Sequence, residues 1–232
     1  MSFNQFQRIK LLLGDDGFRR VRSAHVAVVG CGAVGGFAIE ALARTGVGKL
    51  TLIDGDTVEE SNINRQLCAL NSTLNHHKTD ILKNRIQDIC PDTLVQTHST
   101  FLTEANAADL LADKPDFVID AIDRINDKIA LILFLQKKGI PFISAMGAAR
   151  KTDWRQIKLS RLNQTSVCPL AARLRKELKK SGADTSFPCV YSTENPLPAQ
   201  TLNRQMVSLV TITGTFGLII ANEVILRIAN HV

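Results

Sequence analysis

Aromatic side chains are scarce in this chain of 232 residues, which contains one Trp and one Tyr and has an aromatic content of 5%. Proteins that recognise exposed bases by stacking need several such side chains. Any nucleic acid that binds here must therefore be held largely through charge and shape.

The chain also lacks paired cysteine motifs. Its five cysteines lie at positions 31, 68, 90, 168 and 189, and no two of them have CxxC spacing. The odd number argues against a disulfide framework, and the spacing argues against a four-cysteine zinc site. We therefore expect a reducing environment and no zinc.

Targeting and membrane-spanning signals are weak. The first residues, Met-Ser-Phe-Asn-Gln-Phe-Gln-Arg, lack the apolar core of a signal peptide. The most apolar stretch, 209–228, contains Asn222, Glu223 and Arg227, which disfavour a membrane span. We interpret this stretch as a buried strand that runs into a helix. We expect a cytoplasmic protein without integral membrane insertion, and leave peripheral membrane contact open.

Positive charge is concentrated in one segment. Residues 150–180 contain ten Lys or Arg and only two acidic residues, a net charge of +8, whereas the whole chain carries +6. All of the net basicity therefore belongs to this segment. Such a cluster is typical of a surface that binds phosphates, although a solvated helix face is the alternative explanation.

Short apolar runs alternate with helical patterns along most of the chain. This alternation predicts an α/β protein with a Rossmann-like, doubly wound and mostly parallel sheet. The pattern changes near residue 150, so we expect a nucleotide-binding domain over 1–150 and a C-terminal α+β extension over 151–232, packed on the same core. The predicted strands are 25–29, 49–53, 93–98, 117–121, 140–145 and 156–162, and the predicted helices are 3–13, 37–44, 77–90, 104–113, 126–138 and one that begins at Pro169.

A glycine-rich turn joins the first predicted strand of this alternation to the next helix. Gly30 permits a tight turn, Gly32 lets the backbone approach a phosphate, and Gly35 lets the helix pack closely on the strand. The helix N-terminus offers N–H groups to an anion. Asp54 ends the second strand, where a carboxylate accepts hydrogen bonds from ribose hydroxyls. This part of the sequence therefore predicts a nucleotide site.

The residues that follow favour ATP over a nicotinamide dinucleotide. Asn62, Arg65 and Gln66 lie within twelve residues of Asp54, and Lys78 follows thirteen residues after Arg65. Asp123 lies at the end of a later strand, where it can hold Mg²⁺. Two cations and a magnesium-binding carboxylate beside a phosphate-binding turn suit a triphosphate.

At these residues the chain resembles the ThiF/MoeB/HesA family of adenylating enzymes, relatives of the ubiquitin-activating enzymes. The family pattern GxGxxG, DxD, NxxRQ and a downstream Lys is matched at 30–35, 54–56, 62–66 and 78. The resemblance implies adenylation of a carboxylate by ATP and Mg²⁺ in a homodimer. It assigns nucleotide binding to Gly30, Gly32, Gly35, Asp54, Asp56, Asn62, Arg65, Gln66 and Lys78, magnesium to Asp123, and contact with the γ-phosphate of the other subunit to Arg8.

The region after residue 150 resembles the tRNA threonylcarbamoyladenosine dehydratases. The motifs that carry this resemblance are Asp153-Trp-Arg-Gln-Ile, Pro169-Leu-Ala-Ala-Arg-Leu-Arg-Lys-Glu-Leu and Cys189-Val-Tyr-Ser-Thr-Glu. It implies that the activated carboxylate belongs to a modified adenosine at tRNA position 37. It also implies that the cations of the predicted helix meet tRNA phosphates, namely Arg173, Arg175, Lys176, Lys179 and Lys180.

Two other functions and one residue role stay open at this point. The chain could adenylate the C-terminus of a ubiquitin-like or sulfur-carrier protein, or it could be an NAD-binding, dehydrogenase-like module. Cys189 is either a nucleophile or a buried structural thiol. The catalytic residues that we predict are Arg8, Arg65, Lys78 and Asp123.

Overall fold

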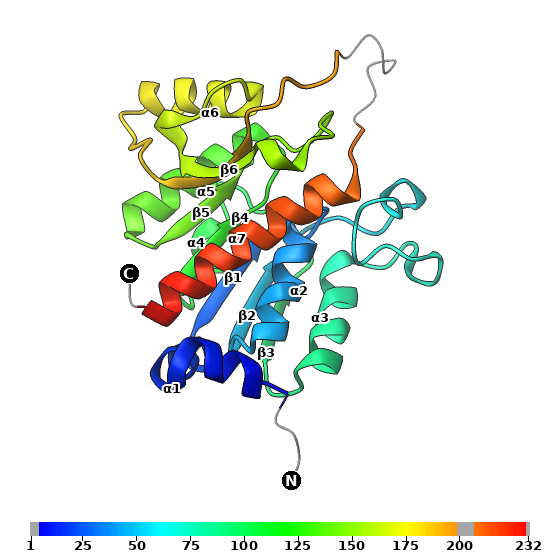
Figure 1. Ribbon diagram of the computed structural model, residues 1–232. Coiled ribbons are helices and arrows are strands. Elements are labelled where there is room, and N and C mark those ends of the chain that lie inside the picture. The colour runs from blue at the N-terminus through cyan, green and yellow to red at the C-terminus, as the bar shows by residue number, and fades with distance from the viewer. Residues whose placement is uncertain (1–4, 199–206, 231–232) are drawn as a thin grey trace.

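The computed structural model describes residues 5–198 and 207–230, and its strands form one sheet (Figure 1). The strand order is β3-β2-β1-β4-β5-β7-β6. All neighbours pair in parallel except β6 and β7, which are antiparallel. The predicted α/β class with a mostly parallel sheet is therefore confirmed. The strands are β1 His25–Val29, β2 Lys49–Ile53, β3 Leu94–His98, β4 Phe117–Asp120, β5 Phe142–Ala145, β6 Ile157–Arg161 and β7 Pro188–Ser192.

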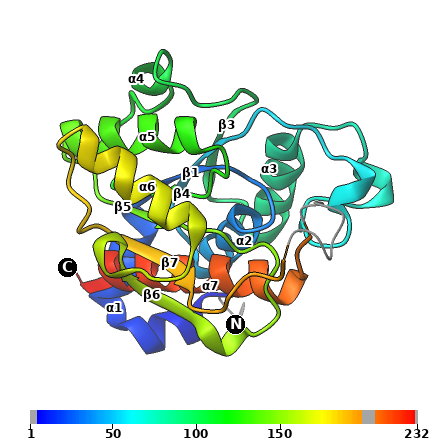
Figure 2. The same ribbon diagram turned by 90° about the horizontal axis from the view of Figure 1, so that it is seen from above.

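Helices cover both faces of this sheet (Figure 2). Helices α2, α3 and α7 pack on one face, with α1 beside α7, whereas α4, α5 and α6 pack on the other. The helices are α1 Gln7–Ser23, α2 Gly35–Thr45, α3 Lys78–Ile89, α4 Ala107–Leu110, α5 Ile125–Lys138, α6 Pro169–Lys180 and α7 Val210–Asn230, with 3-10 turns at Glu60–Asn62, Asn71–Thr73, Trp154–Gln156 and Leu162–Gln164.

The sequence of β1 explains why this strand lies in the interior of the sheet, between β2 and β4. Val26 and Val28 belong to the core beneath α2 and α7, whereas Ala27 and Val29 belong to the core beneath α5. Successive side chains of a strand point to opposite faces, so a continuous apolar run suits a strand that is buried on both sides. The same pattern explains the apolar runs of β4 and β5.

The prediction of a strand followed by a helix over 209–228 is wrong. Residues Val210–Asn230 form the single helix α7, which packs against α2. A Cβ atom at Gly217 would lie 2.4 Å from the carbonyl oxygen of Val34, so glycine is needed for this close approach. The helix is long and apolar enough to span a membrane, but 56% of its most apolar window is buried within the protein. Its composition is that of a core helix.

Three further elements differ from the predictions. Helix α1 continues to Ser23, well past the predicted end at residue 13, and Gly14 interrupts it with a φ of 72°. The predicted start of this helix at residue 3 lies outside the described residues. Only the single turn α4 forms within the predicted helix 104–113. No strand was predicted at Pro188–Ser192, where β7 forms and pairs with β5, so segments before and after residue 150 contribute to the same sheet.

Candidate active site

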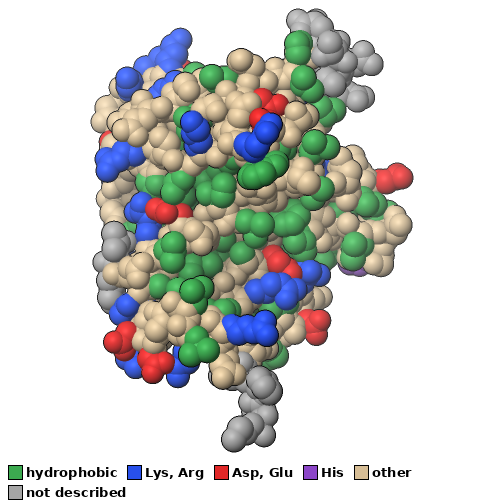
Figure 3. All heavy atoms as spheres, in the orientation of Figure 1, with side chains coloured by type: hydrophobic (Ala, Val, Ile, Leu, Met, Phe, Trp, Pro, Cys, Tyr) green, Lys and Arg blue, Asp and Glu red, His purple; other side chains and the backbone are tan. Residues whose placement is uncertain are grey.

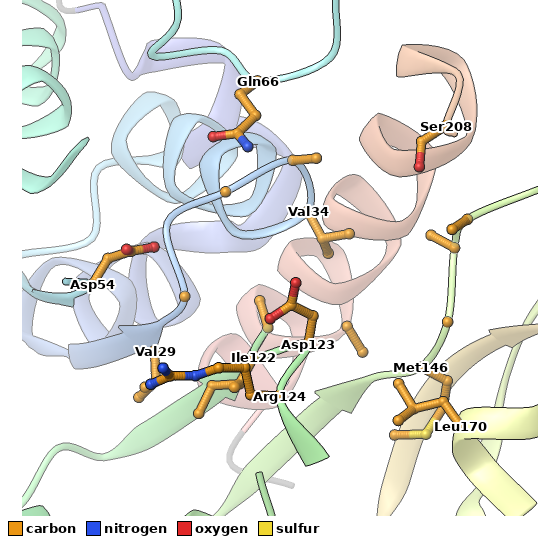
Figure 4. Close-up of a pocket in the computed structure, with 18 of the residues that line it drawn as sticks. Val29, Val34, Asp54, Gln66, Ile122, Asp123, Arg124, Met146, Leu170 and Ser208 are labelled. Atoms are coloured by element: carbon orange, nitrogen blue, oxygen red, sulfur yellow. The ribbon is translucent and has the colours of Figure 1, made fainter. Parts of the chain in front are cut away.

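A cavity of about 710 Å³ lies at the carboxyl ends of the central strands. This is the edge at which open α/β sheets bind ligands. Figure 4 shows Asp54 and Gln66 on one side of the cavity, Met146 and Leu170 on the other, and Asp123 between them. The cavity therefore has two halves, which we call the nucleotide half and the acceptor half.

The glycine turn packs against the loop that follows β4, and this packing leaves no room for larger residues. A Cβ atom at Gly30 would lie 2.6 Å from the carbonyl oxygen of Ala121, and one at Gly35 would lie 1.8 Å from that of Gly30. Gly32 lines the cavity. Because no side chain caps the N-terminus of α2, this helix end suits an anion. The glycine-rich turn is thus formed where the sequence predicted it, and its contact with a phosphate stays a prediction.

Asp54 is buried at the end of β2 and is held by two backbone groups. Cys31 N donates to its Oδ2 at 2.6 Å, and Asp56 N donates to its Oδ1 at 2.8 Å. Burial raises the pKa of the Asp54 carboxyl, and the two hydrogen bonds oppose this shift only in part. The carboxylate is therefore oriented in advance at the position where a nucleotide ribose would lie.

Lys78 supplies a buried ammonium group to the nucleotide half. It is the first residue of α3, and its Nζ lies 2.8 Å from Oδ2 of Asp56, whose side chain is 52% exposed. A half-exposed carboxylate is a weak partner because water screens it. Asp56 therefore orients Lys78 while leaving most of its charge available to a phosphate.

The loop that contains the NxxRQ motif places two of its polar side chains in the cavity wall. Arg65 and Gln66 line the cavity, whereas Asn62 does not. The Oδ1 atom of Asn62 accepts from Glu59 N at 3.3 Å, and its carbonyl oxygen accepts from the backbone N of Arg65 and of Gln66. Asn62 thus orders the loop that carries Arg65. Its position outside the cavity wall does not support the direct phosphate contact that was predicted for it.

Asp123 is exposed in the loop between β4 and α5, and it points into the cavity (Figure 4). Within the described residues no group of three or more His, Cys, Asp or Glu side chains is placed to hold a metal ion. Proteins commonly hold Mg²⁺ through one or two carboxylates together with substrate phosphates. A single free carboxylate facing a phosphate-binding turn fits such a magnesium–nucleotide site.

The acceptor half is lined by segments that follow β5 and by the start of α6. Lys151 lies in this wall, 3% exposed, and its Nζ donates to the carbonyl oxygens of Ser192 and Glu194 at 3.4 and 2.5 Å. Burial lowers the pKa of the Lys151 ammonium. The acceptor half therefore contains a cation that sequence reasoning missed, because nothing in its local sequence distinguishes it from the surrounding basic residues.

Comparison with known proteins agrees with this geometry. The pattern of the ThiF family matches residues 5–232. The chain belongs to the ThiF family. It is 41% identical to the tRNA threonylcarbamoyladenosine dehydratase of Bacillus subtilis over 84% of this chain and 76% of that protein, and 39% identical to that of Escherichia coli over 79% and 71%.

Solved structures of the same Escherichia coli member of the ThiF family have this fold. The complex of that enzyme with ATP superposes with a TM-score of 0.90 at 34% identity, and covers 97% of this chain and 93% of that one. The complex with AMP has a TM-score of 0.91 at 35% identity, with the same coverage. The nucleotide half described above thus occurs in a fold that is known to bind both nucleotides.

Cys189 and Arg8, two further predicted site residues of this ThiF-family chain, also lie outside the cavity wall. Cys189 is completely buried in β7, and burial raises the pKa of its thiol to about 12, which argues against a nucleophile. Arg8 is exposed on α1, at the end of the molecule opposite the cavity (Figure 1). Arg8 cannot reach the cavity of its own chain, so a role in catalysis requires a second copy.

Helix α6 forms over Pro169–Lys180 and presents its cations unequally. Arg173, Lys176 and Lys179 are exposed. Lys180 is also exposed, although its Nζ lies 2.9 Å from Oε1 of Glu177. Arg175 instead turns inward and donates to the carbonyl oxygens of Leu162 and Thr165. Arg175 was predicted to contact tRNA. Its guanidinium instead stabilises the 3-10 turn at Leu162–Gln164, which is a structural role.

Sequence reasoning missed an aromatic group at the edge of the nucleotide half. Phe101 and Leu102 follow β3, and the guanidinium of Arg124 lies 4.0 Å from the centre of the Phe101 ring. With Ile122, they give this end of the cavity an apolar wall suited to a nucleobase. Residues just after the other parallel strands were predicted to form the site, because ligands bind at the carboxyl ends of such strands. Applied to β3, which ends at His98, this rule would have identified Phe101.

Proposed function

We propose that this protein is an ATP-dependent tRNA threonylcarbamoyladenosine dehydratase. The observation that carries the proposal is one cavity that joins a nucleotide half, built around Asp54, Arg65 and Lys78, to an acceptor half whose wall includes the first turn of the basic helix α6. The likeness to dehydratases of that name along most of the chain supports it.

The reaction requires two steps in the same cavity. A carboxylate oxygen of the threonyl group attacks the α-phosphorus of ATP, the bond to the bridging oxygen breaks, and pyrophosphate leaves. The ureido group of the same nucleoside then attacks the acyl carbon, AMP leaves and a ring closes, with net loss of water. Because the second nucleophile belongs to the substrate, no enzyme thiol is needed, which agrees with the burial of Cys189.

The first step brings one anion towards another, so the site must offset their repulsion. Lys78 and Arg65 would contact the phosphates, and Asp123 would hold a magnesium ion. The ion supplies a Lewis acid for the phosphate oxygens. Fixed cations at the phosphates stabilise the charge that develops in the transition state. The buried Lys151 would stabilise the incoming carboxylate from the acceptor half.

The tRNA would lie across α6. Arg173, Lys176 and Lys179 are exposed on the helix whose N-terminal turn borders the acceptor half, so phosphates bound there would direct a nucleoside into the cavity. Such contacts give affinity that depends strongly on salt and little on sequence. A tRNA substrate supports the predicted cytoplasmic location, and peripheral membrane association stays a prediction.

The proposed assembly is a homodimer formed through the face that α7 crosses. Figure 3 shows hydrophobic side chains gathered over the middle of this face. Leu218 and Leu226 of α7 are 52% and 39% exposed, and Leu11 and Leu12 of α1 are 78% and 84% exposed. Contiguous exposed apolar patches are typical of interaction sites. Pairing this face would also give Arg8, on α1, a route to the partner's cavity.

AMP release tests the proposed function. Purified protein is incubated with ATP, Mg²⁺ and tRNA that carries threonylcarbamoyladenosine, with unmodified tRNA as the control. We expect stoichiometric AMP, pyrophosphate and the cyclised nucleoside, detected by mass spectrometry, only with the modified tRNA. Absence of AMP with that tRNA would refute the proposal.

Two measurements distinguish the other two functions: AMP formation with a carrier protein, and binding of NAD. AMP formation that depends on a Gly-Gly-ended carrier protein and resists RNase would indicate an activating enzyme for that carrier. Tight NAD binding without competition by ATP, and insensitive to Lys78→Ala, would indicate a dinucleotide-binding module.

A further inference from the structure

Three completely buried polar side chains form a network directly behind the cavity wall. The Nζ atom of Lys128 donates to Oδ2 of Asp120 at 2.6 Å and to Oγ of Ser144 at 3.1 Å. The hydroxyl of Ser144 also donates to Oδ2 of Asp120, at 2.5 Å. All three residues have no exposed surface, and Lys128 is among the largest buried side chains of the described part.

Stability alone is a poor reason for such a network. Removing two opposite charges from water costs about as much as their attraction returns, and apolar residues of similar volume often replace a buried pair without loss. A buried ion pair does impose a specific geometry, because each charge must keep its partner. The useful question is therefore which parts of the molecule these three residues hold in place.

The network holds the loop that carries Asp123. The second oxygen of Asp120, Oδ1, accepts from the backbone N of Ile122 at 3.1 Å. Residues 121–123 line the cavity, and the carbonyl oxygen of Ala121 lies against Gly30 of the glycine turn. The Asp120 carboxylate thus fixes the loop between the phosphate-binding turn and the predicted magnesium ligand.

The network also reaches the acceptor half. Ser144 lies in β5, beside Asp120 of β4, and residues 145–147 continue directly into the cavity wall. Lys128 belongs to α5, so one ammonium group ties together two strand ends and the helix that packs over them. Each half of the cavity is therefore anchored to the same buried cation.

We propose that Lys128 is a positioning residue for the reaction: through Asp120 and Ser144 it sets the spacing between the magnesium–nucleotide and the carboxylate that attacks it. This inference rests on the proposed function. In-line attack requires reacting atoms about 3–3.5 Å apart, and a shift of about 1 Å can lower the rate roughly 100-fold. The network requires no contact with either substrate.

A pair of substitutions separates this role from a merely structural one. Lys128→Met leaves the Asp120 carboxylate buried without its cation, so we expect a lower melting temperature. Asp120→Asn combined with Lys128→Met removes both charges and should restore the melting temperature to within a few degrees. The kcat for AMP formation should nevertheless stay at least about tenfold below that of the unsubstituted protein. Recovery of kcat together with stability would overturn the proposal.

A binding measurement tests the link to Asp123 without any tRNA. ATP is titrated calorimetrically with and without Mg²⁺, and the gain in affinity caused by Mg²⁺ is compared between variants. We expect Asp120→Asn/Lys128→Met to lose this gain to the same extent as Asp123→Asn, and the triple variant to lose no more. Retention of the gain, or a protein whose ATP affinity does not depend on Mg²⁺, would contradict positioning through Asp123.

A matched control removes another buried hydrogen bond, between two residues that do not line the cavity. Thr51→Val breaks the 2.7 Å contact with Nε2 of His25, on the strands β1 and β2. It should lower the melting temperature while leaving kcat and the Mg²⁺ gain unchanged. If the unsubstituted protein forms no AMP but the network variant still loses its Mg²⁺ gain, the proposed function fails and the positioning role stands.

Discussion

At the scale of single residues, the site depends on side chains whose charge is held in place before a ligand arrives. Asp54 is fixed by two backbone N–H groups, and Lys78 is held by the half-exposed Asp56. Such preorganisation matters because groups that do not reorient during the reaction stabilise the transition state most effectively.

Replacing Lys78 with Ala should reduce kcat/KM for ATP by about 10²–10³-fold, the usual effect of losing one preorganised group at a developing charge. Steady-state AMP formation measures it. Lys83→Ala is the matched control, because Lys83 lies on the same helix but outside the cavity wall. A Lys78 variant with the kinetics of the Lys83 control would remove Lys78 from the site.

As the pH falls, ATP affinity should begin to weaken at a higher pH than it would if Asp54 had the pKa of an ordinary aspartate. Burial raises the pKa of Asp54, so its carboxylate is protonated at a higher pH than usual as the solution is acidified. A raised folded-state pKa also means that protonation favours the folded chain, so Asp54 does not cause unfolding in this range. Calorimetric titrations from neutral to mildly acidic pH measure the effect. Asp54→Asn should flatten the profile, and an unchanged profile would contradict this assignment.

Arg175→Ala should destabilise the fold by roughly 1.5–3 kcal/mol, because hydrogen bonds from a charged donor to the carbonyl oxygens of Leu162 and Thr165 are lost. Urea unfolding measures the free energy of unfolding. Lys176→Ala, one residue further along α6, should change it by less than about 0.5 kcal/mol. Equal stability of the two variants would show that the inward contacts of Arg175 contribute little.

At the scale of elements, α6 combines an apolar face with a basic one. Ala171, Leu174 and Leu178 are buried against α5 and β7, which leaves Arg173, Lys176 and Lys179 in solvent. Because the residues within each set are mostly three or four positions apart, each set lies on one side of the helix, and the two sides are opposite. The basic face is therefore a consequence of how the apolar face packs.

Neutralising that face should weaken tRNA binding and make the binding constant depend less on salt concentration. Replacement of Arg173, Lys176 and Lys179 with Gln should reduce the slope of log K against log salt by about one for each lost phosphate contact. Filter binding between low and physiological salt measures the slope. Lys83→Gln on α3 is the control and should leave it unchanged, and equal slopes for both variants would place the tRNA elsewhere.

At the scale of the whole molecule, Arg8 and the cavity lie at opposite ends of one chain. A catalytic role for Arg8 then demands a second copy, and the exposed Leu11 and Leu12 lie on the same helix. Closed two-fold dimers place the same patch of both chains in contact, so each chain can complete the other's site.

Mixing two inactive variants tests this arrangement. Arg8→Ala and Lys78→Ala, each inactive alone, should together recover about a quarter of the full activity, because half of the dimers are mixed and each contains one complete site. Light scattering should show that Leu11→Ser/Leu12→Ser shifts the protein towards monomer with parallel loss of activity. No recovery in the mixture would exclude a shared site.

Much of the nucleotide half could be predicted because its signals are local. Gly30 and Asp54 follow directly after strands, Gly35 begins the next helix, and the carboxyl ends of parallel strands must meet at one edge. The roles of Cys189 and Arg175 could not be predicted in this way. Burial of a thiol or the direction of a guanidinium depends on neighbours that are far away in the sequence.

Helix α7 shows the same division at a larger scale. Its apolar composition indicated burial, but its β-branched residues also suited a strand. In the structure the whole segment is a helix that packs closely on α2, and this contact requires glycine at position 217, since a Cβ atom there would collide with the backbone of α2 and the residue before it. Tertiary packing thus overrode the local preference.

The sequence by itself determined the mostly parallel character of the sheet, the glycine-rich turn and the basic helix, because each depends on residue types at short, regular spacing. Only the tertiary structure decided that Lys128, Asp120 and Ser144 meet, that Lys151 enters the acceptor half, and that Arg8 lies far from its own cavity. Burial and side-chain direction are set by packing between distant segments, and no local pattern encodes them.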